Sequence, residues 1–258
     1  MPSRPTKTVG SLFAGIGGFD LAARWCGWAT RWYSEIEPYA CKIMAKHFPE
    51  AENLGDITKL TNPPPVDVLV GGFPCQDISV ANAKGEGING KRSGLWAEYA
   101  RIIGEVRPSW VVIENSPLLR RKGLDRVLRD LVALGYDAEW HCIPASAVGA
   151  PHQRDRIWIV AYPVSAGLQG HAGDGPIQHQ LRRLLAEAHR SIGEAGVRGG
   201  EHTEGWWNAE PAVGRVAHGV PARVDRIRCL GNAVVPDIPH LIFRAIKAWE
   251  EQHVVPIP

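Results

Sequence analysis

Short apolar runs alternate with amphipathic stretches over the first 163 residues. The apolar runs predict buried strands at 9–13, 30–34, 66–70, 110–113, 138–143 and 157–161. Amphipathic stretches between them predict helices at 19–26 and 39–48. A third helix is predicted where apolar side chains recur at three-to-four spacing, at Leu95, Tyr99, Ile102, Ile103 and Val106.

This alternation predicts an α/β fold with a doubly wound, mostly parallel sheet of the Rossmann-like kind. Ligands of such sheets bind at the carboxyl ends of the strands. A glycine-rich turn at 13–18, Glu35, Pro74 and Glu114 all follow or end predicted strands. The pattern therefore predicts one binding edge that these residues share.

The pattern changes after Pro163. The stretch 164–222 holds 11 glycines in 59 residues, and only one helix is predicted in it, at 177–189. Regular periodicity returns at Val224 and ends in a predicted helix at 238–250. We therefore expect three segments, in which 223–258 rejoins the domain formed by 1–163 and 164–222 is an insertion.

Composition limits the function classes. The 258 residues are 45% hydrophobic and 22% charged with a net charge of +2, so nucleic acid would have to bind a local patch. Five cysteines without a CxxC pair argue against a disulfide framework or a zinc site and favour a reducing compartment. No apolar run has the length of a membrane span, and the first residues lack a signal-peptide pattern. We expect a soluble, cytoplasmic protein without a membrane partner.

The glycine-rich turn favours a nucleoside ligand. Glycines after a strand let backbone N–H groups approach a ligand, and Glu35 is placed to accept hydrogen bonds from a ribose. The full GxGxxG pattern is absent, which favours a mononucleoside over a dinucleotide. Asp56 is a candidate partner for an adenine amine. The alternatives are a plain strand-to-helix connection and a solvated turn aspartate.

Two further residues are candidates for covalent and acid–base chemistry. Cys75 lies between glycines and a proline after a buried strand, which favours an exposed nucleophile, whereas the other four cysteines are interpreted as packing residues. Glu114 follows the apolar run WVVI, where burial would raise its pKa and make it a proton donor. A structural capping carboxylate is the alternative. Arg154 and Arg156 would share one face of a strand and could hold a phosphate or a substrate edge.

The order of these motifs is more specific than any one of them. Together they closely resemble the DNA (cytosine-5) methyltransferase family of bacteria and phages, over 8–163 and 224–242. The motifs that carry the resemblance are FAGIGG, an acidic residue after the second strand, GDI, GGFPCQ, KRSGLW, ENS, QRDR and GNAVVP.

The resemblance implies a reaction on a cytosine flipped out of duplex DNA. Cys75 would add to C6, Glu114 would protonate N3, and Arg154 would contact the cytosine carbonyl. C5 would then take a methyl group from S-adenosyl-L-methionine. The cofactor would contact residues that match the family's pocket: Phe13, Gly15, Gly17, Glu35, Asp56, Ile57, Pro74, Leu95, Asn232 and Val234. DNA would contact Gln76, Ser79, His152 and Arg156.

By the same resemblance, 164–222 would be a short target-recognition insertion. Its five arginines are outnumbered by six acids, so we expect the catalytic cleft to supply most of the DNA affinity. The sequence departs from the family at Ser11, where aspartate is common, at Ser116 and at His152. We expect a monomer that acts on double-stranded DNA, with a separate cognate restriction endonuclease as a potential companion.

Three other functions were weighed. An RNA cytosine methyltransferase on the same scaffold would typically carry a late Cys-Phe-Thr tripeptide, which this sequence lacks. An inactive cofactor-binding module would be expected to lack Cys75 or Glu114, and both are present. A nicotinamide enzyme would leave the PCQ and ENS motifs unexplained.

Overall fold

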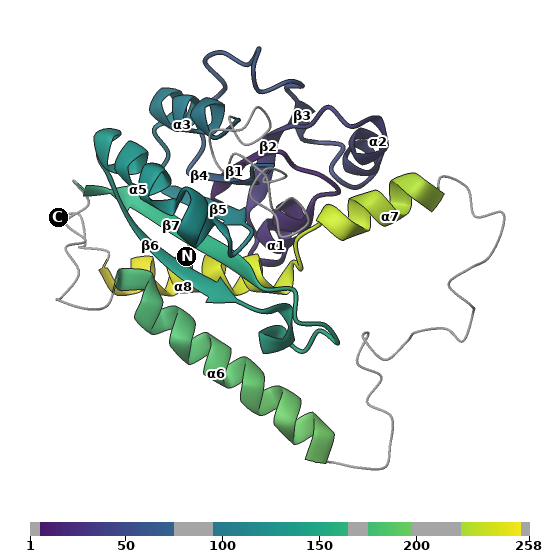
Figure 1. Cartoon of the computed structure of the whole chain (residues 1–258), viewed down its shortest axis with the longest axis vertical. Helices are drawn as coiled ribbons and strands as arrows, with labels where there is room; N and C mark the ends of the chain where they lie inside the picture. Colours follow the sequence, from purple (N-terminus) through teal and green to yellow (C-terminus); the bar gives the residue numbers. More distant parts are fainter. Residues whose placement is uncertain (1–5, 75–94, 165–174, 198–222, 254–258) are drawn as a thin grey trace.

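A computed structural model describes residues 6–74, 95–164, 175–197 and 223–253. Seven strands form one sheet in the order β3-β2-β1-β4-β5-β7-β6 (Figure 1). Their bounds are Thr8–Leu12 for β1, Ala29–Ser34 for β2, Glu52–Asn53 for β3, Val68–Gly72 for β4, Trp110–Asn115 for β5, Tyr136–Ile143 for β6 and Arg156–Pro163 for β7. The first five strands pair in parallel, and β7 runs antiparallel to both β5 and β6. The predicted mostly parallel α/β sheet is confirmed.

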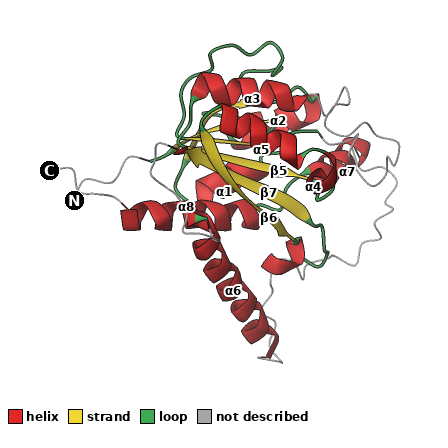
Figure 2. Cartoon of the chain, turned by 60° about the vertical axis from the view of Figure 1, so that its left-hand side comes forward, coloured by secondary structure: helices red, strands yellow, loops and turns green. Residues whose placement is uncertain are grey.

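Helices cover both faces of the sheet (Figure 2). The helices of the described residues are α1 (Gly18–Trp25), α2 (Pro38–His47), α3 (Leu95–Val106), α4 (Leu119–Lys122), α5 (Leu124–Ala133), α6 (Pro176–Val197), α7 (Arg223–Asn232) and α8 (Asp237–His253), with a short 3-10 helix η2 (Ala145–Val148). None of these helices is both long enough and apolar enough to cross a lipid bilayer.

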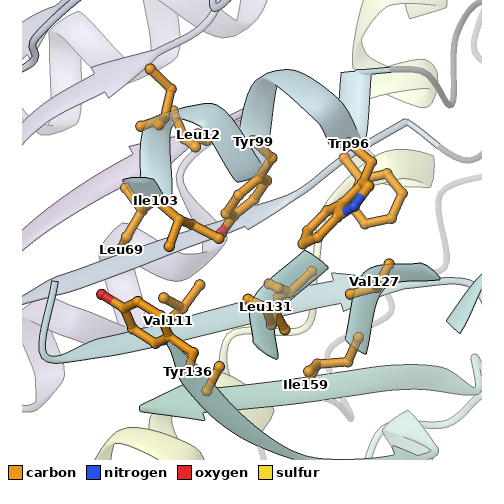
Figure 3. Packing of buried hydrophobic residues seen from close by; sticks show 14 of the residues in the cluster. Leu12, Leu69, Trp96, Tyr99, Ile103, Val111, Val127, Leu131, Tyr136 and Ile159 are labelled. Carbon is orange, nitrogen blue, oxygen red and sulfur yellow. The ribbon is translucent and has the colours of Figure 1, made fainter. Parts of the chain in front are cut away.

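Alternate side chains of the central strands enter two separate cores. On one face Leu12, Leu69 and Val111 pack with Trp96, Tyr99 and Ile103 of α3 (Figure 3). On the other face Val9, Val70, Val112 and Val160 pack with α1, α8 and the first half of α6. Because both faces are covered, the central strands are almost uniformly apolar, which is why the sequence shows them as runs.

The sequence and the structure differ mainly where polar residues dominate. The short strand β3 and helices α4, α5 and α7 were not predicted. Strand β3 and helix α4 are too short to show a period, whereas α5 has apolar residues at helical spacing that the sequence interpretation did not use. Helix α6 extends to Val197, beyond the predicted end at 189. Its first turn is held by the carboxylate of Glu139 on β6, which accepts a hydrogen bond from the backbone N–H of Ile177 at 2.9 Å.

Candidate active site

The carboxyl ends of β1, β2, β4 and β5 meet at one edge of the sheet. The register places Leu12 beside both Ser34 and Gly71, and Gly72 beside Glu114. The turn after β1, Glu35 after β2, Pro74 after β4 and Glu114 at the end of β5 therefore share this edge, as the sequence predicts. Cys75, Gln76 and Ser79 lie outside the described residues.

Glu114 is a largely buried carboxylate at this edge. Its side chain is 13% exposed, and its Oε1 lies 2.8 Å from Nε of Arg156. Burial raises the pKa of Glu114, while the positive charges of Arg156 and Arg154 oppose that rise. The carboxylate also lies against β4, because a Cβ added to Gly72 would come within 2.7 Å of its Oε2. A buried carboxyl group with a raised pKa can donate a proton near neutral pH.

Asn115 holds the chain that leads from β4 toward Cys75. Its Nδ2 donates a buried hydrogen bond to the carbonyl of Phe73 at 3.1 Å, and its Oδ1 accepts one from the N–H of Ser116 at 2.8 Å. The side chain thus links the ends of β4 and β5. The departure at Ser116 leaves this link intact, since Ser116 takes part through its backbone.

Arg154 and Arg156 do not share a strand face, so this prediction is wrong. The strand β7 begins at Arg156, and Arg154 precedes it with a left-handed backbone (φ 38) that interrupts the strand alternation. Nη2 of Arg154 donates to the carbonyls of Gly231 and Ala233, at 2.8 and 2.6 Å. Arg156 contacts Glu114, whereas Arg154 binds the end of α7 and the residue that follows it.

The turn after β1 offers backbone groups to a ligand. Gly15 and Gly17 have positive φ angles of 56 and 84, and a side chain at Gly15 would meet open space. The carboxylate of Glu35 spans the turn and the start of α2. Its Oε2 accepts from the N–H of Gly15 at 2.7 Å, and its Oε1 accepts from the N–H groups of Ile36 and Glu37 at 2.8 Å each. About one of the roughly four lone-pair positions of the carboxylate stays available for a ligand hydroxyl.

The other residues predicted to bind the cofactor differ in their contacts and burial. The rings of Phe13 and Tyr99 stack at 6.4 Å. Asp56 caps its own turn by accepting from the N–H and hydroxyl of Thr58, and these bonds lower its pKa. The side chain of Ile57 is buried in the core, and Leu95 packs at the border of the same core.

The C-terminal segment contributes one wall. A Cβ on Gly18 would come within 2.5 Å of Cγ2 of Val234, so Val234 packs directly on the glycine turn. Asn232 is exposed at the end of α7. His152 is exposed on the segment before Arg154. The structure thus brings Val234 to the site and leaves the side chains of Asn232 and His152 at its surface.

Two residues near the turn were missed by the sequence interpretation. Ile36 is 68% exposed directly beside Glu35, and an apolar residue between two acids after a buried strand is the signal that could have found it. Asp20 is fully buried in α1 and accepts from the hydroxyls of Ser11 and Thr30 at 3.1 and 3.0 Å. Ser11, where the family commonly has aspartate, thus donates a hydrogen bond to the carboxylate of Asp20 on α1.

The chain as a whole matches one protein family. Residues 7–192 match the family model of the C-5 cytosine-specific DNA methylase. The chain belongs to this family. It is 36% identical over 161 residues to the Type II methyltransferase M2.BsuMI of Bacillus subtilis (59% of this chain, 41% of the relative), and 36% identical over 154 residues to M.CviJI of a Paramecium bursaria Chlorella virus (58% and 41%). This member thus spans about two fifths of the length of these relatives.

Solved structures agree with the fold. A DNA modification methyltransferase encoded within an E. coli prophage superimposes with a TM-score of 0.54 at 25% identity, over 64% of this chain and 49% of that one. A Spodoptera frugiperda DNMT2 variant superimposes with a TM-score of 0.53 at 21% identity, over 66% of this chain and 54% of that one. The methylase fold assignment is confirmed by these similarities.

Proposed function

We propose that this C-5 cytosine DNA methylase transfers a methyl group from S-adenosyl-L-methionine to C5 of a cytosine flipped out of a short specific site in duplex DNA. The observation that carries the proposal is the position of Glu114, buried against Gly72 and beside Arg156. Gly72 lies three residues before Cys75, so the chain needs only a short connection to bring a thiolate near this acid.

The residues around the glycine turn fit the proposed cofactor. A free lone pair on Glu35, the open space at Gly15 and the exposed side chain of Ile36 suit a ribose hydroxyl, a close backbone contact and an adenine face respectively. Val234, which packs on the glycine turn, would form another side of the cofactor pocket. When bound, S-adenosyl-L-methionine supplies an electrophilic methyl group.

Cytosine C5 is a weak nucleophile, and the chain must activate it. The thiolate of Cys75 would add to C6 while Glu114 gives its proton to N3, so that the ring becomes a neutral enamine with a nucleophilic C5. C5 would then take the methyl group, and the sulfur that carried it would leave as the neutral thioether S-adenosyl-L-homocysteine. A base then removes the C5 proton, the Cys75–C6 bond breaks, and 5-methylcytosine is released. Covalent addition and a positioned acid together supply what the free base lacks.

The contacts of the two arginines support an exchange of their expected roles. Arg156 is the residue beside Glu114, so we assign it the contact with the cytosine carbonyl that the resemblance gives to Arg154. Arg154 is instead a positioning residue, because its hydrogen bonds hold the carbonyls of Gly231 and Ala233 next to Val234.

The wider setting follows from the same proposal. The enzyme acts as a monomer on double-stranded DNA in the cytoplasm of a bacterium or of a phage-infected host, with 164–222 as its target-recognition insertion. A restriction endonuclease that cuts the same sequence would act separately, as expected of a Type II restriction–modification system.

Base-resolution mapping of 5-methylcytosine tests the proposal. DNA is taken from a methylation-free bacterial host that expresses the wild-type chain, Cys75→Ser, Glu114→Gln or the control Cys142→Ser, which alters an exposed cysteine of β6. We expect methylation at one short motif in the wild type and the control, and none with Cys75→Ser. Loss with Glu114→Gln should be about 10²-fold or more. A folded wild-type chain that binds S-adenosyl-L-methionine and leaves DNA unmethylated would refute the proposal.

A further inference from the structure

A basic cluster follows the active site directly in the chain and has no part in the proposed reaction. Helix α4 begins four residues after the end of β5 and carries Arg120, Arg121 and Lys122 in succession. Both arginines are exposed, and Lys122 is partly exposed. We call these three residues, together with Trp140 of β6, the α4 patch.

The guanidinium of Arg120 lies over the ring of Trp140. Its carbon atom lies 5.2 Å from the centroid of the Trp140 ring, and Trp140 is 38% exposed although it lies within a strand. Stacking uses the face of the guanidinium and leaves its in-plane N–H donors free. Those donors form the fork that binds phosphate in a bidentate way. An arginine on an exposed tryptophan is thus preorganised for a phosphate oxygen.

The other two charges of the patch have no ion-pair partner among the described residues. Across the residues that the structure describes, Arg121 and Lys122 form no ion pair. The adjacent helix α5 differs, since Arg126 pairs with Asp130 and Arg129 with Asp125. Because the whole chain carries a net charge of only +2, three basic residues in succession make a local positive field.

The position of the patch fits a duplex that presents a base to Glu114. Asn115 ends β5 and Leu119 begins α4, so their Cα atoms are at most about 14 Å apart. A half-turn of B-DNA rises about 17 Å. Phosphates that flank a target base at Glu114 would therefore come within reach of α4.

We propose that the α4 patch binds phosphates of the DNA strand that flanks the target cytosine. This inference rests on the proposed function and adds an electrostatic anchor outside the catalytic groups. Arg120 supplies an oriented contact, and Arg121 and Lys122 supply charge. DNA duplex is the partner because the patch combines unpaired cations with an exposed aromatic side chain beside a site that takes a nucleobase.

The salt dependence of DNA binding tests the patch. Anisotropy of a fluorescein-labelled mixed-sequence 30-bp duplex is titrated with the full chain between about 50 and about 200 mM KCl. Each lost phosphate contact lowers the slope of log affinity against log salt by about 0.9. For Arg121→Gln/Lys122→Gln we expect a slope smaller by about 1.8, so that the loss of affinity across this salt range is about tenfold smaller than in wild type.

A matched control removes the same charge from the neighbouring helix. Arg126→Gln/Arg129→Gln should keep the wild-type slope. Trp140→Leu should weaken binding severalfold while largely preserving the slope, since the charge of Arg120 remains. Affinity for S-adenosyl-L-methionine, measured by calorimetry, should be unchanged in every variant.

The outcomes separate the two proposals. Equal slopes for wild type and both double variants, with DNA still methylated by wild type, would overturn the α4 patch alone. A parallel loss of cofactor affinity in Arg121→Gln/Lys122→Gln would also overturn it, because the residues would then act through the fold. If the wild-type chain showed no salt-dependent duplex binding and no methylation, both the proposed function and the α4 patch would be refuted.

Discussion

Nε of Arg156 lies 2.8 Å from Oε1 of Glu114, although the two residues stand on strands that run in opposite directions. Glu114 is the last residue but one of β5, which ends at the site, and Arg156 is the first residue of β7, which starts there. Antiparallel pairing of β5 and β7 thus places the proton donor beside a permanent positive charge. This pairing explains why Arg156, rather than Arg154, is beside the acid.

The contact has a consequence for pH dependence. Burial raises the pKa of Glu114 and the charge of Arg156 opposes the rise, so Arg156→Gln should raise that pKa further. Since the protonated acid is the active form, the fall of the methylation rate with increasing pH should move to higher pH. Single-turnover rates measured between about pH 6 and about pH 9 would show it. Arg154→Gln is the control, and a larger shift in that variant would contradict the assignment.

Asn115 provides a second prediction. Asn115→Asp keeps the oxygen that accepts from Ser116 but loses the donor to the carbonyl of Phe73, which is left unsatisfied in a buried place. The free energy of unfolding should fall by about 1–3 kcal/mol. The methylation rate should fall more than the affinity for S-adenosyl-L-methionine, because the bond holds the chain before Cys75. Equal losses in both would argue for a general structural effect.

The contact between the glycine turn and the C-terminal segment can be tested by a double-mutant cycle. Gly18→Ala places a Cβ within 2.5 Å of Cγ2 of Val234, so it should push this wall away and weaken cofactor binding about tenfold or more. Val234→Ala removes the methyl groups that clash. The double variant should recover part of the affinity measured by calorimetry, and additive losses would show that the two positions act independently.

Asp20 predicts an unusual dependence of stability on pH. Burial raises the pKa of Asp20 to about 6, above its ordinary value of 3.8. Between these values the folded chain binds a proton that the unfolded chain has lost, so stability falls as pH rises from about 4 to about 6. The loss amounts to about 3 kcal/mol and is complete above about pH 6. Asp20→Asn should lack it, which urea unfolding of both proteins at about pH 5 and about pH 8 would show.

Asp67 serves as a control of opposite sign. Burial would raise its pKa, but hydrogen bonds from the N–H and hydroxyl of Thr8 lower it overall. Its contribution to stability is therefore present above the unfolded pKa and is lost as pH falls. If Asp67→Asn and Asp20→Asn changed the pH profile in the same direction, the account of Asp20 would be wrong.

The buried strands and the binding edge were predictable because their apolar runs need both faces covered. The same patterns placed Glu35 and Glu114 correctly, since residues at the ends of parallel strands must meet at one edge. The roles of Arg154 and Arg156 were not predictable, because they depend on a left-handed residue that ends the alternation just before β7. The link from Asn115 to Phe73 was equally hidden, as it joins backbone and side chain across two strands.

The α4 patch could be seen in the sequence as three adjacent basic residues, but its partner Trp140 could not. Tryptophan in a predicted strand is normally a core residue, and only the position of β6 at the edge of the sheet leaves its ring exposed. Helix α5 could also be seen in the sequence, because Leu124, Val127, Leu128 and Leu131 recur at helical spacing, but the sequence interpretation did not use this signal.

Helix α6 is a single helix of 22 residues, Pro176–Val197, whose length determines how far the chain extends from β6. Its first turn is bonded to Glu139 in the middle of β6, and Leu185 and His189 line one pocket with Ile143 and Pro144 at the end of that strand. It therefore runs back toward the edge that β7 has just left, and its eight residues beyond His189 extend it by about 12 Å. Removing two turns of α6 would shorten the helix by about 11 Å without altering Glu114 or the glycine turn. The reach of the proposed target-recognition insertion could thus change by whole helical turns while the proposed chemistry stays constant.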